Sequence, residues 1–142
     1  MSNIYTEKAL SGLASDIAAK LKGHENIYLS GELGAGKTTF TKKLLAHLGV
    51  KSSVKSPSYQ IIDIHNIDDT KKVAHIDLYR LDDINDIAIL GLEDILDDQN
   101  TIAVIEWPER AEHLLPEPNH HLHFTHRSPD TRTIEINNID DE

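Results

Sequence analysis

The segment NIYLSGELGAGKTTFTKKLLAHLG, residues 26–49, constrains the fold more than any other part of this 142-residue chain. Its centre, GELGAGKT, fits the pattern G-x-x-x-x-G-K-[ST], which is informative where a strand precedes it and a helix begins within it. Both conditions are predicted here, because residues 26–30 form a short apolar run and residues 37–48 have the composition of a helix that ends at Gly49. The segment therefore predicts a phosphate-binding loop, called here the glycine loop (residues 31–38), in an α/β domain.

The residue types in the glycine loop suit a polyphosphate ligand. Glycines at Gly31, Gly34 and Gly36 permit backbone conformations that other residues avoid, so successive N–H groups can turn inward around a phosphate. The amino end of the following helix adds a partial positive charge. We expect Lys37 to reach the β- and γ-phosphates and the Thr38 hydroxyl to hold Mg²⁺.

A second motif, TIAVIEWPE at residues 101–109, has the pattern of a Walker B strand, in which four apolar residues lead to Glu106. Ligands bind at the carboxyl ends of the strands in open α/β sheets, so this carboxylate is predicted to lie beside the glycine loop. There it would bind Mg²⁺, directly or through water, or orient the attacking water.

Two further segments add candidate side chains. In HIDLYR, residues 75–80, His75 and Asp77 share one face of a predicted strand. Asp77 is a candidate to activate water or reach the metal, and Arg80 to stabilise phosphate charge. The loop SPSY, residues 56–59, offers hydroxyls that would close over a γ-phosphate. Taken alone, the first segment also fits an ion pair at a strand end and the second a plain turn.

The remaining periodicities indicate a mixed α/β fold. Apolar residues at helical spacing predict a helix over residues 7–22, which Thr6 is placed to cap and Gly23 to end. We also expect strands at 59–66, 73–79 and 101–107, two acidic helices within 82–98 separated near Gly91, a helical segment within 108–116, and a hairpin of strands 120–126 and 131–137. Together these predict one domain over residues 1–142, a P-loop NTPase with a mixed, mostly parallel central sheet flanked by helices.

The charge of the chain is uneven. The net charge of −10 argues against unaided binding to nucleic acid, because phosphate contacts need a basic surface. Residues 1–55 nevertheless carry eight lysines against four acidic residues, whereas residues 56–142 carry six basic against twenty acidic residues. The basic end suits an anionic ligand at the glycine loop. The acidic residues 82–98 fit either a face for a protein partner or a solvated helix.

Composition also bears on the cellular location of the chain and on the disulfides and metal sites that it can form. No apolar stretch approaches the roughly 20 residues that span a bilayer, and the first ten residues lack a signal core, so we expect a cytoplasmic protein without membrane contact. No cysteine is present, which excludes disulfides and thiolate metal sites. The histidines of residues 120–126 make a poor zinc site, since a strand face would hold two of them with no acid or thiol to complete the set.

Two other functions stay open alongside an ATPase. The chain has neither the N-K-x-D motif of GTPases nor the L-S-G-G-Q motif of ABC proteins. A small-molecule kinase would need an acceptor site and more arginines than the four present, Arg80, Arg110, Arg127 and Arg132. A nucleotide-dependent binding module, whose hydrolysis is incidental, fits the motifs as well. We expect no arginine finger, and therefore slow hydrolysis by the isolated chain.

Four motifs in this order, GELGAGKTT, VKSPSY, HIDLYRL and VIEWPER, resemble the TsaE family. The resemblance runs from about Thr6 to Arg110. That family comprises the bacterial ATPases of tRNA threonylcarbamoyladenosine biosynthesis, so the resemblance implies a P-loop fold, ATP and Mg²⁺. It also implies action beside TsaB and TsaD, the partners that transfer threonylcarbamoyl to adenosine 37 of tRNA, with tRNA met only through that complex.

The resemblance also implies roles for individual residues. The phosphates would be bound by Gly34, Ala35, Gly36, Lys37, Thr38 and Thr39. Thr38 and Glu106 would handle Mg²⁺, and Asp77 would be an acid needed for hydrolysis. Ser58 would lie in a switch loop, Trp107 would be an aromatic linked to the site, and Thr6 would lie near the nucleotide base. Ser58 and Gln60 stand where the family more often has threonines, and serine keeps the hydroxyl.

Overall fold

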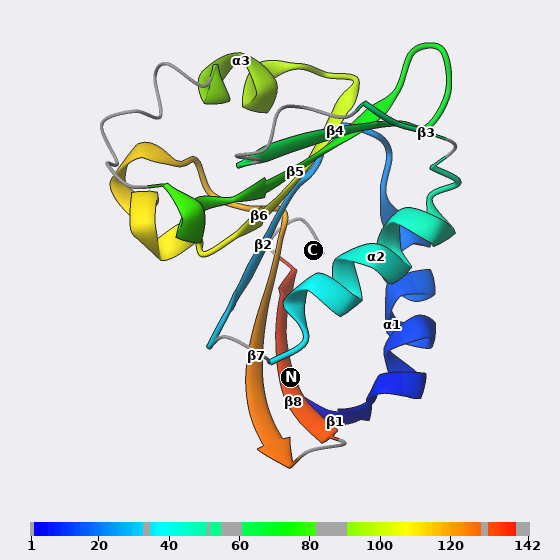
Figure 1. The fold of residues 1–142 in the computed structure, drawn as a ribbon, viewed down its shortest axis with the longest axis vertical. Helices are drawn as coiled ribbons and strands as arrows, with labels where there is room; N and C mark the ends of the chain where they lie inside the picture. Colours follow the sequence, from blue (N-terminus) through cyan, green and yellow to red (C-terminus); the bar gives the residue numbers. More distant parts are fainter. Residues whose placement is uncertain are drawn as a thin grey trace.

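One eight-stranded sheet runs through the chain, in the order β1-β8-β7-β2-β6-β5-β4-β3 (Figure 1). This computed structural model describes residues 2–32, 35–50, 52–54, 61–81, 91–128 and 131–138. The strands are β1 (Ser2–Thr6), β2 (Asn26–Gly31), β3 (Ser52–Val54), β4 (Ile62–Asn66), β5 (Lys72–Asp77), β6 (Thr101–Glu106), β7 (His120–Ser128) and β8 (Thr131–Asn138). The helices are α1 (Glu7–Lys20), α2 (Lys37–His47) and α3 (Leu92–Asp97), with the 3₁₀-helices η1 (Leu78–Arg80) and η3 (Pro108–Leu114).

The centre of the sheet is parallel and its margins are antiparallel. Strands β7, β2, β6 and β5 run in the same direction, while β8 and β1 on one side and β4 and β3 on the other pair antiparallel. The carboxyl ends of β2, β6 and β5 therefore meet at one edge, where ligands bind in such sheets. The mixed, mostly parallel sheet flanked by helices that the sequence predicts is confirmed.

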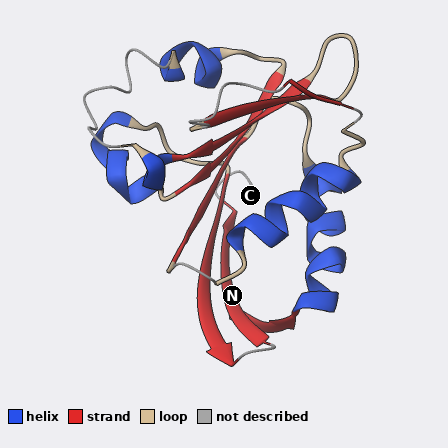
Figure 2. Cartoon of the chain, in the orientation of Figure 1, coloured by secondary structure: helices blue, strands red, loops and turns tan. Residues whose placement is uncertain are grey.

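Each face of the sheet has its own apolar core. Helices α1 and α2 lie side by side against one face of the sheet (Figure 2). On this face Leu10 and Phe40 pack with Leu29 of β2. Helix α3 and η3 lie toward the other face, where Leu92 packs in a second cluster with Tyr28 of β2. Alternate residues of β2 thus enter opposite cores, which is why the strand is apolar from Ile27 to Leu29.

Most of the predicted elements are present. Thr6 caps α1 by accepting a hydrogen bond from the Ala9 N–H at 3.1 Å, and Gly49 follows α2 with φ +80°. The closing hairpin is β7 and β8, and the helical segment after residue 107 is the 3₁₀-helix η3. Of the two expected acidic helices, the second is α3, and residues 82–90 lie outside the described part of the chain.

Two whole strands and one strand end differ from what the sequence predicts. Strands β1 and β3 were not predicted, because both are short strands at the margins of the sheet, where pairing with a distant neighbour decides the conformation. Leu78 and Tyr79 were expected in a strand but begin η1, because the Asp77 carboxylate accepts a hydrogen bond from the Tyr79 N–H at 3.1 Å and caps that turn.

No helix in the described residues is long and apolar enough to cross a membrane.

Candidate functional site

A cavity of about 540 Å³ lies where the glycine loop, β5 and β6 meet, and most of the predicted site residues line it. The lining residues are Gly36, Lys37, Thr38, Thr39, Asp77, Tyr79, Arg80, Glu106, Trp107 and Arg132. Lys37, Asp77 and Glu106, which are successively 40 and 29 positions apart along the chain, are brought together because β5 pairs beside β6, and β6 beside β2. We call this cavity the phosphate-loop cavity.

Lys37 is buried at the base of this cavity, with 4% of its surface exposed. Its ammonium donates a hydrogen bond to the Gly31 carbonyl and lies 3.7 Å from the centre of the Trp107 ring. Burial lowers the pKa of Lys37, while the carboxylates of Glu106 and Glu109 act in the opposite direction. A desolvated cation held this close to the loop is well placed to pair with a phosphate oxygen.

Packing requires the glycines at both ends of the loop. Gly31 has φ +136°, and a Cβ there would overlap the backbone carbonyl of Phe124 on β7. Gly36 has φ +103°, forms the N-cap of α2, and a Cβ there would overlap the Arg132 guanidinium. Any other residue at these positions would therefore meet both backbone strain and a steric clash. Gly31 allows β2 to pair closely with β7, and Gly36 allows the loop to approach Arg132.

Glu106 is held from two sides. It is 3% exposed, and one carboxylate oxygen, Oε2, is 2.5 Å from Nε2 of His75. The other oxygen, Oε1, accepts a hydrogen bond from the Thr38 hydroxyl at 3.5 Å. Sequence analysis placed His75 on the same strand face as Asp77 but did not predict its bond to Glu106. That bond depends on the register of β5 against β6, which pairs His75 with Val104 and Asp77 with Glu106.

Asp77 lies beside Glu106 and has partners of its own. Burial raises the pKa of Asp77, and the neighbouring Glu106 carboxylate adds to that effect. Its second oxygen, Oδ2, is 3.4 Å from Nε of Arg80, whose side chain is 61% exposed. Asp77 therefore has a structural role as the cap of η1 in addition to the role in hydrolysis that the sequence predicts.

Arg132 is a site residue that no motif indicated. It belongs to β8, near the end of the chain, yet it lines the phosphate-loop cavity and is only 7% exposed. Its Nε atom is buried without a hydrogen-bond partner among the described residues. A buried guanidinium that has an unused donor suits an anionic ligand. Tyr79 was also missed, and its ring lies 4.9 Å from that of Trp107.

The remaining predicted residues lie elsewhere or are not described. Thr6 caps α1, and Ala35 is fully buried in the core beneath α1 and α2. Neither is among the described residues that line the phosphate-loop cavity. Gly34 and Ser58 lie outside the described residues, so their roles stay predictions. In the part of the chain that is described, no group of three or more histidine or acidic side chains is arranged to hold a metal ion, including the histidines of β7.

These features define the class: an α/β protein with a glycine-loop motif at the carboxyl edge of a mostly parallel sheet. The chain belongs to the TsaE family, because the family described as "Threonylcarbamoyl adenosine biosynthesis protein TsaE" matches residues 4–134. The resemblance found in the sequence motifs is thereby confirmed.

Individual relatives agree with this assignment. The chain is 38% identical over 110 residues to the tRNA threonylcarbamoyladenosine biosynthesis protein TsaE of Haemophilus influenzae, covering 78% of this chain and 68% of that protein. It is 45% identical over 109 residues to the protein of the same name from Aquifex aeolicus, covering 75% of each. The crystal structure of Bacillus subtilis YdiB matches with a TM-score of 0.76 at 27% identity, covering 98% of this chain and 85% of that one.

Proposed function

We propose that this chain is a cytoplasmic, Mg²⁺-dependent ATPase that serves tRNA threonylcarbamoyladenosine biosynthesis together with TsaB and TsaD. The observation that carries the proposal is the convergence of Lys37, Thr38 and Glu106 in one cavity at the carboxyl edge of the sheet. Membership of the family supports the pathway, and these three side chains support the type of reaction. Phosphoryl transfer depends mostly on positioning and on electrostatic stabilisation, which a preformed cavity of this kind provides.

Each side chain has a distinct part in the proposed reaction. The Lys37 ammonium, and Arg132 through its free Nε donor, would stabilise negative charge on the phosphates as it develops. Either Glu106 or Asp77 would orient the attacking water, since the two carboxylates are paired neighbours on β6 and β5. His75 would keep Glu106 in one orientation through its 2.5 Å contact.

The donor atoms in the cavity fit Mg²⁺. A hydroxyl oxygen of Thr38 and a carboxylate oxygen of Glu106 lie 3.5 Å apart, and Mg²⁺ prefers oxygen ligands contributed by few protein groups together with substrate phosphates. The Oε2 oxygen of Glu106 is engaged by His75 at 2.5 Å, so Oε1, which accepts only the longer 3.5 Å bond from Thr38 among the described residues, is the oxygen that would bind the metal. When bound, Mg²⁺ would neutralise charge on the β- and γ-oxygens.

The charge distribution supports a division of labour with partner proteins. A chain with a net charge of −10 is poorly suited to hold tRNA itself, so we propose that tRNA is bound by TsaB and TsaD. Arg132 is buried in the cavity, whereas Arg80, the second arginine that lines it, is paired with Asp77 and largely exposed. Because Arg80 is not held toward the phosphates, we expect slow hydrolysis by the chain alone and faster hydrolysis in the complex.

The test is ATP hydrolysis by the purified chain, alone and with TsaB, TsaD and tRNA, beside the variant Lys37→Ala. We expect the partners to raise turnover and Lys37→Ala to abolish it in both conditions. Lys8→Ala, which removes an exposed lysine from α1, is the matched control and should behave as the wild type. Turnover that ignores the partners would contradict the role in the complex. Phosphate transfer to a small hydroxyl compound in place of water would favour a kinase.

A further inference from the structure

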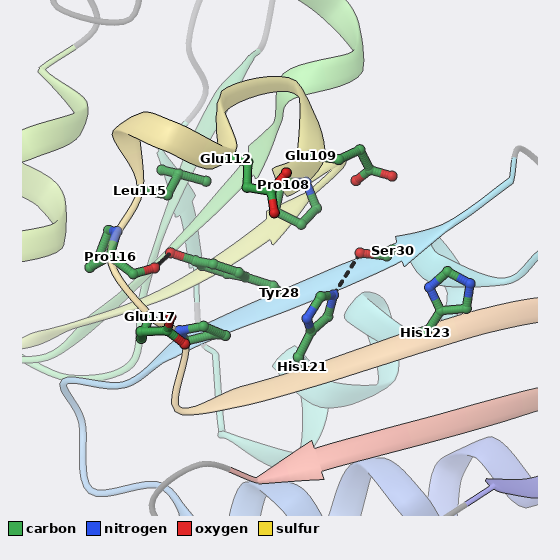
Figure 3. A pocket seen from close by; sticks show the side chains of 11 residues that line it. Tyr28, Ser30, Pro108, Glu109, Glu112, Leu115, Pro116, Glu117, His121 and His123 are labelled. Atoms are coloured by element: carbon green, nitrogen blue, oxygen red, sulfur yellow. Dashed lines mark hydrogen bonds between the residues drawn. The ribbon is translucent and has the colours of Figure 1, made fainter.

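A second cavity, of about 390 Å³, lies between η3 and the β2–β7 part of the sheet (Figure 3). We call it the acidic pocket. It is lined by Tyr28, Ser30, Pro108, Glu109, Glu112, Leu115, Pro116, Glu117, Pro118, His121 and His123. Nothing in the proposed hydrolysis of ATP uses these side chains.

The floor of the acidic pocket is already hydrogen-bonded. The Tyr28 hydroxyl donates to the Pro116 carbonyl at 2.6 Å, and burial raises the pKa of Tyr28 to about 12. Ser30 Oγ and His121 Nε2 are 2.7 Å apart, and the Tyr28 and His121 rings meet edge to face with centroids 6.1 Å apart (Figure 3). Tyr28 is only 5% exposed, so the surface that the pocket offers is mainly the partly exposed His121 ring together with Pro116 and Pro118.

The mouth of the acidic pocket is negatively charged. Glu109 and Glu112 project from η3 and Glu117 follows it, and all three are exposed. None of the described residues that line the pocket is a lysine or an arginine. Burial and the neighbouring His123 lower the pKa of His121, so the imidazole at the floor adds no positive charge near neutral pH. An aromatic floor beneath three carboxylates is complementary to a cation that also carries apolar surface.

The pocket continues into an open sheet face. His123 of β7 and Glu135 of β8 are register partners and both are exposed, whereas α1 and α2 cover the opposite face. Ile4 of β1 is 56% exposed, and Leu114, next to the pocket residue Leu115, is 53% exposed. The uncovered sheet face offers a protein partner area to bury beside the pocket.

We propose that the acidic pocket receives an arginine side chain presented by a protein partner. A guanidinium can stack on the His121 ring and the surfaces of Pro116 and Pro118 while it donates hydrogen bonds to the carboxylates at the mouth. A lysine ammonium is compact and strongly hydrated, and it matches the carboxylates but not the flat aromatic floor. A protein partner fits better than a free small molecule, because the open sheet face gives it further area to cover.

The acidic pocket also adjoins the phosphate-loop cavity. Ser30 directly precedes Gly31, and Pro108 directly follows Trp107, whose N–H donates to the Leu29 carbonyl at 3.1 Å. An arginine bound in the pocket would therefore contact the residues next to both motifs of the proposed ATPase site. Any effect on hydrolysis rests on the proposed function, but binding in the pocket does not.

Binding can be measured without nucleotide by NMR titration of the whole chain. The probe is N-acetyl-arginine N-methylamide, and the signals are those of the Tyr28, His121 and His123 rings. We expect a saturable shift with this probe, a weaker one with the lysine analogue, and none with the uncharged citrulline analogue. Equal responses to the arginine and citrulline analogues, or no saturable shift of these rings, would overturn the proposal.

The matched variants remove charge without touching the proposed ATPase site. Glu112→Gln/Glu117→Gln is preferred because the charge of Glu109 is also felt by Lys37. This double variant should bind the arginine probe with about fivefold lower affinity, which is the effect expected from the loss of two exposed ion pairs. Asp16→Asn/Glu93→Gln removes two exposed carboxylates that do not line the pocket and should leave the affinity unchanged. An equal loss of affinity for the arginine probe in both double variants would contradict specific binding in the acidic pocket. Shifts of these rings that grow with protein concentration alone would place a second copy of the chain there instead.

Discussion

The phosphate-loop cavity and the acidic pocket lie next to each other in the chain but are built in opposite ways. Trp107 lines the first and Gly31 accepts a hydrogen bond from its Lys37, while their neighbours Ser30 and Pro108 line the second. The first has a buried lysine and a buried arginine, whereas three exposed glutamates surround the second. The ends of β2 and β6 thus carry two contrasting sites: a cavity whose buried cations lie beside the carboxylates of Asp77 and Glu106, and a pocket with exposed carboxylates and no lysine or arginine among its described lining residues.

The two sites also differ in how the sequence specifies them. The phosphate-loop cavity depends on short contiguous motifs whose chemistry is fixed by spacing, such as G-x-x-x-x-G-K-T. The acidic pocket depends on β7 pairing in parallel with β2 and on η3 folding back over Tyr28. A site of the first kind can be predicted from the sequence, whereas a site of the second kind can be identified only from the three-dimensional structure.

The largest expected effect concerns Gly31, where the two sites meet. Gly31→Ala would place a Cβ against the Phe124 carbonyl at φ +136°, and we expect it to lower the free energy of unfolding by about 3 kcal/mol. Gly12→Ala, in the interior of α1 with no atom within 4 Å of the added Cβ, should instead raise it by about 1 kcal/mol. Denaturant unfolding measures both. Equal stabilities would show that the approach of β2 to β7 is less close than described.

The next effect separates the two carboxylates of the phosphate-loop cavity. Glu106→Gln keeps the shape of the side chain but removes its charge, and we expect turnover to fall about 100-fold while ATP still binds. Asp77→Asn is the matched comparison, because Asp77 is the register partner of Glu106 on the neighbouring strand. Steady-state hydrolysis of both variants decides the assignment. A greater loss in Asp77→Asn would make Asp77 the residue that orients water.

His75 should have a smaller effect that acts through Glu106. His75→Ala leaves a buried carboxylate oxygen without its 2.5 Å partner, so we expect a loss of about 2 kcal/mol in unfolding free energy. Turnover should fall about tenfold with little change in KM, because His75 contacts Glu106 but is not among the described residues that line the phosphate-loop cavity. His75→Gln, which can still donate a hydrogen bond, should recover part of the turnover. A purely structural role would lower stability without the recovery of kcat.

The smallest effect tests the acidic pocket in the complex. Glu112→Gln/Glu117→Gln should leave hydrolysis by the isolated chain unchanged, since neither residue lines the phosphate-loop cavity. If the pocket holds an arginine of TsaB or TsaD, about fivefold more partner should be needed to reach half of the maximal stimulation. An unchanged partner titration would place the interface elsewhere, for example on the acidic helix α3. Glu93→Gln on that helix is therefore the informative second variant.

Sequence patterns predicted the parts of the fold that local chemistry decides. Thr6 as the cap of α1 and the hairpin of β7 and β8 were correct, because a capping hydroxyl and a turn between alternating strands act over a few residues. Strands β1 and β3 were missed, since their partners β8 and β4 are what hold them in the extended conformation.

The same distinction applies to the site. Lys37, Thr38, Asp77 and Glu106 were predicted and do line one cavity, because each belongs to a motif at a strand end. Arg132 and the contact of His75 with Glu106 were not predicted, since they follow from strand order and register. Nothing in the sequence of β8 indicates that Arg132 faces the glycine loop.

The most direct test of the central claim is a calorimetric titration of ATP with Mg²⁺ into the chain, compared with Lys37→Ala and Lys8→Ala. The account predicts saturable binding at one site in the wild type and in Lys8→Ala, and a loss of at least about 100-fold in affinity for Lys37→Ala. Binding of equal strength in all three would contradict a nucleotide site built on the glycine loop.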